Sequence, residues 1–308
     1  MSVHGLRMTA HDWGLIAILA VVWGGAFFLI ELGLTGFGPL TLVALRMLLA
    51  IPLMLLALKW LGHALPRDAR SWWQLTLLGF FNVAMPMALF FWAQTRIDSA
   101  LAAILNATVP LWGVLIAHIF THDERATPLK LLGVLLGFGG IIVMVGPDAV
   151  GGMGQDVVAQ LACLFAAASF AGAAVYARRL GATIAPMAAA TGQIVTAAAL
   201  IAPLALIVEQ PWAAPTPNLT AVAAMLTLAL VGTSFAYFIF FRLIDRAGAS
   251  NALLIALVMP PVAILLGVAV LGEVLTGGQI MGMSLISLGL LVIDGRLFAR
   301  LAPRASVP

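Results

Sequence analysis

The stretch SALAAILNATVPLWGVLIAHIFTHDE, residues 99–124, decides the fold, because the chain carries a second version of it about 150 positions later. Residues 249–273 read ASNALLIALVMPPVAILLGVAVLGE, and a shift of 150 places Pro110 on Pro260. Each copy begins with small residues and continues as an apolar run that proline interrupts. The two stretches therefore read as one helix used twice.

The residues around the prolines agree at the same shift. Asp123 falls on Glu273 where each apolar run stops, and Arg96 falls on Arg246 in the segment that precedes each run. A single matched proline would be weak evidence, whereas proline, arginine and acid agree here at one offset. The pattern predicts an internal duplication.

The amino-acid composition indicates whether the protein folds in water or in a lipid bilayer. Hydrophobic residues make up 63% of the 308 residues and charged residues only 9%, whereas a soluble domain carries about 25% charged residues. The mean hydropathy is +1.12. The alternative is a soluble protein, but so few polar residues could not cover the surface of a soluble protein of this size. The sequence therefore predicts an integral membrane protein.

Apolar runs of about 20 residues, the length that crosses a bilayer as a helix, occur ten times. They are continuously apolar and do not alternate as barrel strands would, so we expect an all-α protein with ten transmembrane helices. The predicted spans are 13–30, 39–58, 73–93, 100–120, 128–146, 157–177, 184–207, 219–241, 249–271 and 279–297.

Five spans per half make the second repeat upside down relative to the first. We predict two inverted five-helix repeats, residues 1–150 and 151–308, which is an architecture of secondary transporters. All but two of the 15 lysines and arginines, the exceptions being Arg46 and Arg96, fall on one side if the N-terminus is cytoplasmic. The distribution predicts that both termini are cytoplasmic.

The motifs resemble those of one transporter family. They are WGGAFFLIELGL at 23–34, the two proline-interrupted runs with an acid at the end of each, and the glycine-rich GVLLGFGGIIVMVG at 133–146. Together they resemble the drug/metabolite transporter superfamily, within it the EamA-type exporters, and among these the aromatic amino-acid exporters. The resemblance covers nearly the whole chain.

That resemblance implies a central cavity between the halves and alternating access. It also implies that the spans at 128–146 and 279–297 are set apart from the substrate path. The moving groups would be the third, fourth and sixth spans against the first, eighth and ninth. A small-molecule substrate and the lipid bilayer are the implied partners, and a bacterial inner membrane is the implied location.

Several classes of function lack their sequence signals. The chain has no phosphate-binding loop for ATP, and Cys163 is its one cysteine, which excludes disulfides and thiolate metal clusters. Neither paired carboxylates nor a histidine cluster gathers at one membrane face, so no enzyme and no cofactor are expected. The net charge of +3 reflects topology and indicates no nucleic acid. The oligomeric state is left open, a monomer included.

Arg46 is the one ionisable residue placed well within a predicted span, and intramembrane charges are functional candidates. It either contacts substrate or gates the outer mouth, or else it has a structural partner such as a helix-end carbonyl or Glu31. The repeat places its counterpart near Gln193. Since no acid lies in the middle of a span, we expect facilitated transport. If transport were instead coupled to protons, His118, near a span end, would be the candidate proton relay. The other interpretation of His118 is a residue at the membrane interface.

Other polar and aromatic residues within the spans complete the predicted cavity. The alternative for each polar residue is a helix-to-helix contact, worth about 0.6 kcal/mol. Two helix faces combine rings with hydroxyl groups, one around Ser169 and Tyr176 and one around Ser234 and Tyr237. The predicted substrate-cavity residues are Trp23, Arg46, Asn82, Trp92, Asn106, Ser169, Tyr176, Ser234 and Tyr237.

Prolines within spans free a carbonyl one turn earlier and allow a bend. We predict that Pro86, Pro110 and Pro260 act as hinges, with a static kink as the alternative. Gly133 and Gly137 form a pair of small residues four apart, which predicts close helix packing.

These observations predict a secondary membrane transporter, driven without ATP, that exports small apolar or aromatic amino acids or related metabolites. Phosphorylated substrates would call for several intramembrane lysines or arginines. The alternatives are a carrier for drugs or hydrophobic cations, which would prefer a buried central carboxylate, and a proton-coupled metabolite antiporter.

Overall fold

The computed structural model describes residues 8–120, 126–150, 155–180, 183–247 and 255–294. Within these residues every regular element is a helix. The elements are α1 (Ala10–Leu34), α2 (Pro39–Trp60), α3 (Ala69–Gly79), η1 (Phe80–Ala84), α4 (Met85–Ala93), α5 (Ser99–Asn106), α6 (Val109–Phe120), α7 (Pro128–Val150), α8 (Gln155–Leu180), α9 (Pro186–Glu209), α10 (Leu219–Ala229), η2 (Leu230–Phe235), α11 (Ala236–Ala247), α13 (Ile255–Leu266), η3 (Gly267–Leu271) and α14 (Gly277–Asp294).

The helices begin at residues that suit a helix N-terminus. Thr9 caps α1 in a reciprocal capping box with Asp12, and the Asp68 carboxylate accepts a 2.8 Å bond from the backbone N–H of Ser71 at the start of α3. Proline occupies the first position of α2 and of α9, where its missing N–H is not needed. Local chemistry therefore fixes these boundaries.

The structure is that of a membrane protein. Within the described residues, seven helices are long and apolar enough to cross a bilayer, and three shorter apolar helices cover 128–144, 258–271 and 277–293. Large apolar side chains also face outward along these helices, with Leu135 70% and Ile207 74% exposed. Side chains of this kind are stable on the outside of a bundle only when lipid covers them.

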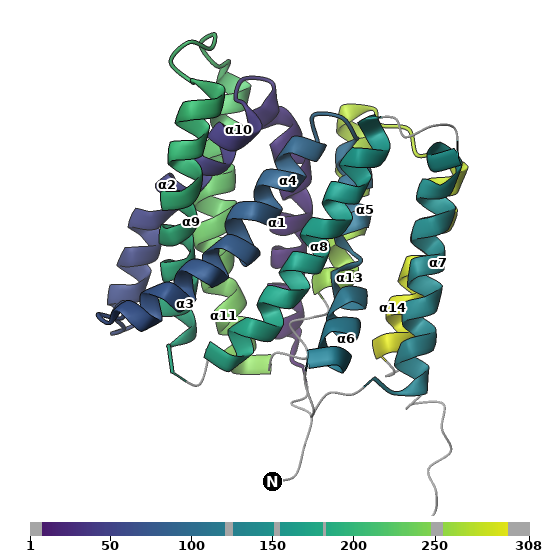
Figure 1. Ribbon diagram of the computed structural model, residues 1–308, viewed down its shortest axis with the longest axis horizontal. Coiled ribbons are helices and arrows are strands. Elements are labelled where there is room, and N and C mark those ends of the chain that lie inside the picture. Colours follow the sequence, from purple (N-terminus) through teal and green to yellow (C-terminus); the bar gives the residue numbers. More distant parts are fainter. Residues whose placement is uncertain (1–7, 121–125, 151–154, 181–182, 248–254, 295–308) are drawn as a thin grey trace, which may run out of the picture.

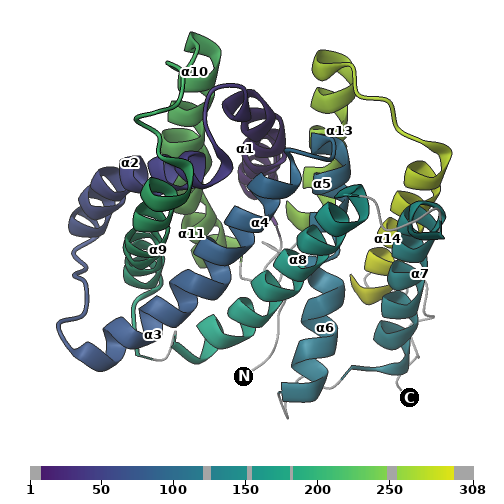
Figure 2. The same cartoon turned by 45° about the horizontal axis from the view of Figure 1, so that its top comes forward.

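Successive transmembrane segments run in alternate directions across the bundle (Figure 1). We call the bottom of Figure 1 the Ala10 end, where α1 starts, and the top the Leu34 end, where α1 finishes. Helix α14 finishes at the Ala10 end. Helix α1 occupies the middle of the bundle (Figure 2), where α5, α10, α11 and α13 pack against it.

Helices α7 and α14 lie side by side at one edge of the bundle in both views. A Cβ atom on Gly133 would lie 2.6 Å from the carbonyl oxygen of Gly289, and one on Gly140 would lie 2.6 Å from that of Gly282. Only glycine permits the two backbones to approach so closely. The predicted close packing at Gly133 is confirmed.

Three predicted spans contain π-helical segments that the apolar pattern did not indicate, and the third of these segments, η3, ends the span predicted at 249–271. Segment η1 interrupts the span predicted at 73–93, and η2 interrupts the span predicted at 219–241. Their first residues, Phe80 and Leu230, are 150 positions apart. Such bulges occur frequently at functional sites, because they break the regular hydrogen-bond ladder.

The two proline-interrupted runs have different backbones in the described residues. The first is split at Ala107 and Thr108 into α5 and α6, and Pro110 is in the first turn of α6. In the second, α13 runs without a break through Pro260. Asp123 and residues 249–254, which belong to the repeated stretches, lie outside the described residues.

Candidate functional site

A buried polar cluster lies where α1, α2 and η2 meet. Arg46 of α2 is 5% exposed; its Nε donates a 2.9 Å bond to the hydroxyl of Thr233, and its Nη2 donates a 3.3 Å bond to the carbonyl of Gly232. The indole Nε1 of Trp23 donates to the same carbonyl at 3.2 Å. Two predicted site residues, Trp23 and Arg46, therefore converge on one π-helical carbonyl.

A second arm of polar side chains continues from this cluster towards η1. The ring of Trp23 meets Tyr237 edge-on with centroids 6.4 Å apart. The Tyr237 hydroxyl accepts a 3.4 Å bond from Nε2 of Gln193, whose Oε1 accepts a 2.9 Å bond from Nδ2 of Asn82. The structure thus brings together four predicted residues: Trp23, Arg46, Asn82 and Tyr237.

Aromatic rings surround these polar groups. Trp23 packs against Phe240 at 5.3 Å between centroids, and Tyr237 stacks with Phe241 at 6.1 Å. The guanidinium carbon of Arg46 lies 6.0 Å from the centre of the Phe91 ring. Apolar walls with a few placed polar groups are the usual make-up of a small-molecule site.

Ser169 and Tyr176 lie in a different place, a groove between α3, η1 and α8. The groove has a volume of about 320 Å³ and is lined by Leu77, Phe81, Ser169, Gly172, Ala173 and Tyr176. The Ser169 hydroxyl donates a 2.5 Å bond to the carbonyl of Phe81 within η1. These two predicted residues of α8 thus lie together in one groove, which η1, the segment that contains Asn82, also lines.

Three further predicted residues lie outside both groups of side chains. The Ser234 hydroxyl donates to the carbonyl of Ala50 at 3.2 Å, so it joins η2 to α2. Trp92 is at the Leu34 end, where the guanidinium carbon of Arg96 lies 5.0 Å from its ring centre. Asn106 is the half-buried last residue of α5.

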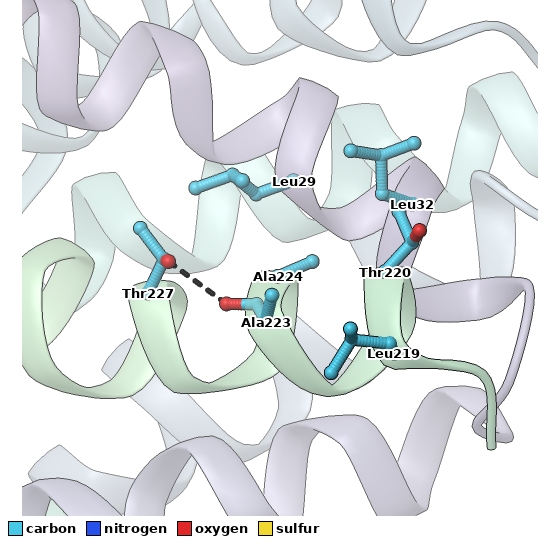
Figure 3. Close-up of a pocket in the computed structure, with 7 residues that line it drawn as sticks. All are labelled: Leu29, Leu32, Leu219, Thr220, Ala223, Ala224 and Thr227. Carbon is cyan, nitrogen blue, oxygen red and sulfur yellow. Dashed lines mark hydrogen bonds between the residues drawn. The ribbon is translucent and has the colours of Figure 1, made fainter.

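Another groove lies at the surface between α1 and α10, and Figure 3 shows its lining. Leu29 and Leu32 of α1 face Leu219 and Ala223 of α10 across about 330 Å³. The Thr227 hydroxyl on its wall already donates to the Ala223 carbonyl at 2.8 Å. The groove is lined by apolar residues and two threonines and holds no charged group, so it suits hydrocarbon better than a polar metabolite.

Carboxylates at the Leu34 end hold helix N-termini, a role that the sequence did not indicate. Glu273 accepts bonds from the Ser99 N–H at 3.0 Å, the Ser99 hydroxyl at 2.6 Å and the Ala100 N–H at 3.0 Å. Glu209 accepts from the N–H groups of Leu40 and Thr41, each at 2.8 Å. Negative charge is favourable at such N-termini.

Asp98 comes directly before Ser99 and faces this arrangement. Partial burial raises the pKa of the Asp98 carboxyl, and the negative charges of Glu273 and Asp156 act in the same direction. Three acids, Asp98, Glu273 and Asp156, therefore lie near one helix N-terminus at the Leu34 end.

The Ala10 end is held by different contacts. The Arg246 guanidinium and the Asp12 carboxylate form a 3.0 Å ion pair between α11 and α1. Arg179 of α8 donates to the carbonyl of Phe120 at the end of α6 at 3.1 Å. His118 is exposed at this end, and its Nδ1 accepts from the Ala126 N–H at 3.1 Å. Among the residues described, three or more metal-ligating acids, histidines or cysteines never gather in one group.

The sequence matches a known family. The model of the EamA-like transporter family matches residues 13–146 and again 157–294. The "Uncharacterized inner membrane transporter YedA" of Escherichia coli K12 is 28% identical over 86% of this chain and 84% of its own length. A "Probable terminal-alkyne amino-acid exporter" of Streptantibioticus cattleyicolor is 25% identical over 96% of this chain and 97% of its own.

A solved crystal structure shares the fold. It aligns with a TM-score of 0.67 at 22% identity and covers 96% of this chain and all of that one. At this identity the likeness shows the fold alone. Because the family model matches most of the chain in two stretches, this protein belongs to the EamA-like transporter family.

Proposed function

We propose that this transporter exports small apolar or aromatic amino acids, or closely related metabolites, as a secondary carrier that uses no ATP. The observation that carries the proposal is the convergence of Arg46 and Trp23 on the Gly232 carbonyl, inside an otherwise apolar bundle. The relative named as an amino-acid exporter supports the same substrate class.

The chemistry of the central cluster fits a carboxylate joined to an apolar side chain. A guanidinium carries five N–H donors in a planar fork that suits carboxylates, and the described bonds of Arg46 use two of them. Trp23, Tyr237 and the neighbouring phenylalanines supply the apolar walls. A buried positive charge disfavours hydrophobic cations, which are the alternative cargo.

The transport mechanism that we propose is alternating access between two inverted repeats, residues 1–150 and 151–308, with Pro86, Pro110 and Pro260 as hinges. Support comes from the two stretches matched by the family model and from the 150-residue spacing of η1 and η2. The break beside Pro110 supports a hinge there, and Pro86 is the second residue of α4, which directly follows η1.

In this mechanism α3, α4, α5, α6 and α8 would rock against α1, α10, α11 and α13. Two of the described polar contacts between these groups lie at the Leu34 end. The Ser99 hydroxyl donates to the Glu273 carboxylate, and the Gln94 amide donates to the Phe27 carbonyl. At the Ala10 end, the Arg246–Asp12 and Arg179–Phe120 contacts each stay within one group. This distribution supports a state closed at the Leu34 end.

We further propose that the protein resides in a bacterial inner membrane with both termini in the cytoplasm. The Ala10 end would then be cytoplasmic and the Leu34 end external. The skew of lysine and arginine along the sequence supports this orientation, as does the relative named as an inner membrane transporter.

Uptake into proteoliposomes that contain only this protein tests the function. Radiolabelled Phe, Trp or Met should enter down its gradient, both with and without an imposed pH gradient. Uptake that requires the pH gradient would replace facilitated transport by proton coupling. The absence of uptake for all three amino acids, with the protein shown to be folded and inserted, would contradict the substrate class.

A further inference from the structure

The carbonyl of Phe81, inside η1, lacks the backbone donor that a regular helix would give it. In an α-helix this carbonyl would accept from the N–H of Met85, four residues later, but that N–H donates to the carbonyl of Phe80 instead. The π-helical spacing would offer the N–H of the fifth residue, and that residue is Pro86, which has none. The π-helical segment and the proline together therefore leave one carbonyl free within a membrane span.

The hydroxyl of Ser169, on α8, takes the place of the missing donor. It donates to the Phe81 carbonyl oxygen at 2.5 Å. The hydroxyls of Thr191, Thr227 and Ser284 each donate to the carbonyl four residues earlier in their own helix, which is a common arrangement within helices. Ser169 instead bonds to a different helix. Because an unpaired carbonyl is costly in a bilayer, this bond stabilises the irregular backbone of η1.

The Phe81 carbonyl belongs to the peptide plane that leads into Asn82. A peptide group is planar and moves as one unit, so a bond that holds this carbonyl also holds the backbone nitrogen of Asn82. The Asn82 side chain donates to Gln193 at 2.9 Å, and Gln193 donates to the hydroxyl of Tyr237 at 3.4 Å. The bond from Ser169 thus acts on the polar cluster through the backbone of η1.

The second π-helical segment shows the same consequence of an irregular hydrogen-bond pattern. The N–H of Ala236, four residues after Gly232, donates to the carbonyls on either side of Gly232. The Gly232 carbonyl accepts instead from the side chains of Arg46 and Trp23. In both segments, a side chain of another helix bonds to the carbonyl that the N–H four residues later does not take. At η1 that side chain is Ser169.

We propose that Ser169 is a positioning residue for transport. Its hydroxyl holds the Phe81 carbonyl, keeps η1 π-helical and so places Asn82 against Gln193 in the polar cluster. This role differs from the contact with substrate that the sequence suggested for Ser169. The placement of Asn82 stands on the geometry of η1 and α8, whereas its consequence for transport rests on the proposed function.

Nuclear magnetic resonance of the full-length protein in detergent tests the bond without a transport measurement. The chain has four asparagines, and only Asn82 follows a phenylalanine. Labelling the phenylalanine carbonyls with ¹³C and the asparagines with ¹⁵N therefore marks the Phe81–Asn82 peptide alone. Ser169→Ala should move the Phe81 carbonyl signal upfield, because the carbonyl loses its donor, and Ser169→Thr should keep it near the wild-type position. Ser284→Ala, at an exposed position on α14, is the control and should leave the signal in place. An unchanged signal in Ser169→Ala would overturn the proposal.

A backbone donor at position 86 should make the Ser169 hydroxyl dispensable. Pro86→Ala supplies an N–H five residues after Phe81, which is the spacing of a π-helix. Ser169→Ala should then shift the Phe81 signal much less in the Pro86→Ala protein than in the wild type. Equal shifts in the two proteins would overturn the proposal, because the missing proline N–H would not be what Ser169 replaces.

Uptake kinetics separate a positioning residue from a contact with substrate. In proteoliposomes, Ser169→Ala should raise the KM for the transported amino acid about fivefold, the value of one neutral hydrogen bond, with little change in maximal rate. Ser169→Thr should restore the KM. In the Pro86→Ala protein, Ser169→Ala should change the KM by about twofold at most. A full-sized effect there would overturn the positioning role in favour of direct contact between Ser169 and substrate. Absence of uptake by the wild type would contradict the proposed function, and the carbonyl signal would still decide whether Ser169 holds η1.

Discussion

Asn82 donates a 2.9 Å hydrogen bond to Oε1 of Gln193, which joins the first π-helical segment to α9. A shift of 150 residues takes Asn82 to Gly232, whose carbonyl accepts a bond from Arg46 of α2. Segments η1 and η2 thus each meet a polar side chain of a helix that is distant in the sequence, α9 and α2 respectively. The two bonds lie in the same cluster, which the chain Arg46–Gly232–Trp23–Tyr237–Gln193–Asn82 connects.

The Asn82–Gln193 bond should make a measurable but small contribution to stability. In a cycle of Asn82→Ala, Gln193→Ala and the double variant, we expect a coupling free energy of unfolding of about 0.6 kcal/mol, the average for such bonds in membrane proteins. Denaturant unfolding in detergent measures it. Full additivity of the two single variants would contradict the bond.

Arg46 should matter more for transport than any exposed arginine. Arg46→Met removes charge-assisted bonds worth about 1.5–3 kcal/mol, and we expect the rate of amino-acid uptake to fall about tenfold or more. Arg46→Lys keeps the charge without the planar fork and should give an intermediate rate. Arg242→Met, at an exposed position on α11, is the matched control. An unchanged rate in Arg46→Met would exclude Arg46 from the substrate site.

The sequence predicts most of this fold because lipid makes the apolar runs long and continuous, and because polar residues inside them are rare. Trp23, Arg46, Asn82 and Tyr237 were found on that basis, and the structure places them in one cluster. A helix is formed by its own backbone, so its existence depends little on its neighbours. That independence explains why the spans could be predicted.

The contacts that tertiary packing creates could not be predicted in this way. Arg46 bonds to η2 and not to Glu31, the partner that its charge suggested. The π-helical segments change the register of backbone hydrogen bonds without changing the side-chain pattern, so no periodicity reveals them. The roles of Gln94 and Glu273 likewise depend on which helix ends meet at the Leu34 end.

The tryptophan–glycine motif of α1 should tolerate no side chain at its first glycine. A Cβ atom on Gly24 would lie 2.6 Å from the Met259 carbonyl and 2.9 Å from Cβ of Val262. We expect Gly24→Ala to destabilise the protein by about 1–3 kcal/mol through overpacking. Gly14→Ala in the same helix has open space around it and should be neutral or stabilising. Equal melting temperatures for the two variants would contradict this packing.

Asp98 should make stability fall as the pH rises. Its pKa in the folded protein is raised above the ordinary 3.8, so folding favours the protonated form, and this favourable contribution is lost as pH rises through the folded pKa. Asp98→Asn should therefore be more stable than the wild type at neutral pH, by at most about 1 kcal/mol because the group is partly exposed. The difference should vanish below about pH 4.

Asp68 supplies a control of opposite sign. Bonds from Ser71 lower the pKa of the Asp68 carboxyl, so its contribution is present above the ordinary pKa and is lost as the pH falls through the folded value. Asp68→Ala should consequently lose stability at neutral pH and match the wild type in strong acid. Melting curves over a pH series measure both variants, and shifts of the same sign would contradict these assignments.

Glu273 and Glu209 should each protect one helix N-terminus from exchange with solvent. Glu273→Ala removes the acceptor of the Ser99 and Ala100 N–H groups, whereas Glu209→Ala removes that of Leu40 and Thr41. Loss of a charge-assisted bond of at least about 1.4 kcal/mol should speed amide hydrogen exchange about tenfold at the affected helix start. Each variant serves as the control for the other, because the other helix start should keep its protection. If Glu273 joins the two moving groups, its loss should also speed amide hydrogen exchange of residues around Gln94, whereas loss of Glu209 should not.

The outcome that would contradict the two separate contacts is amide exchange that changes equally at both helix starts in both variants. Such a result would show that each variant loosens the whole protein.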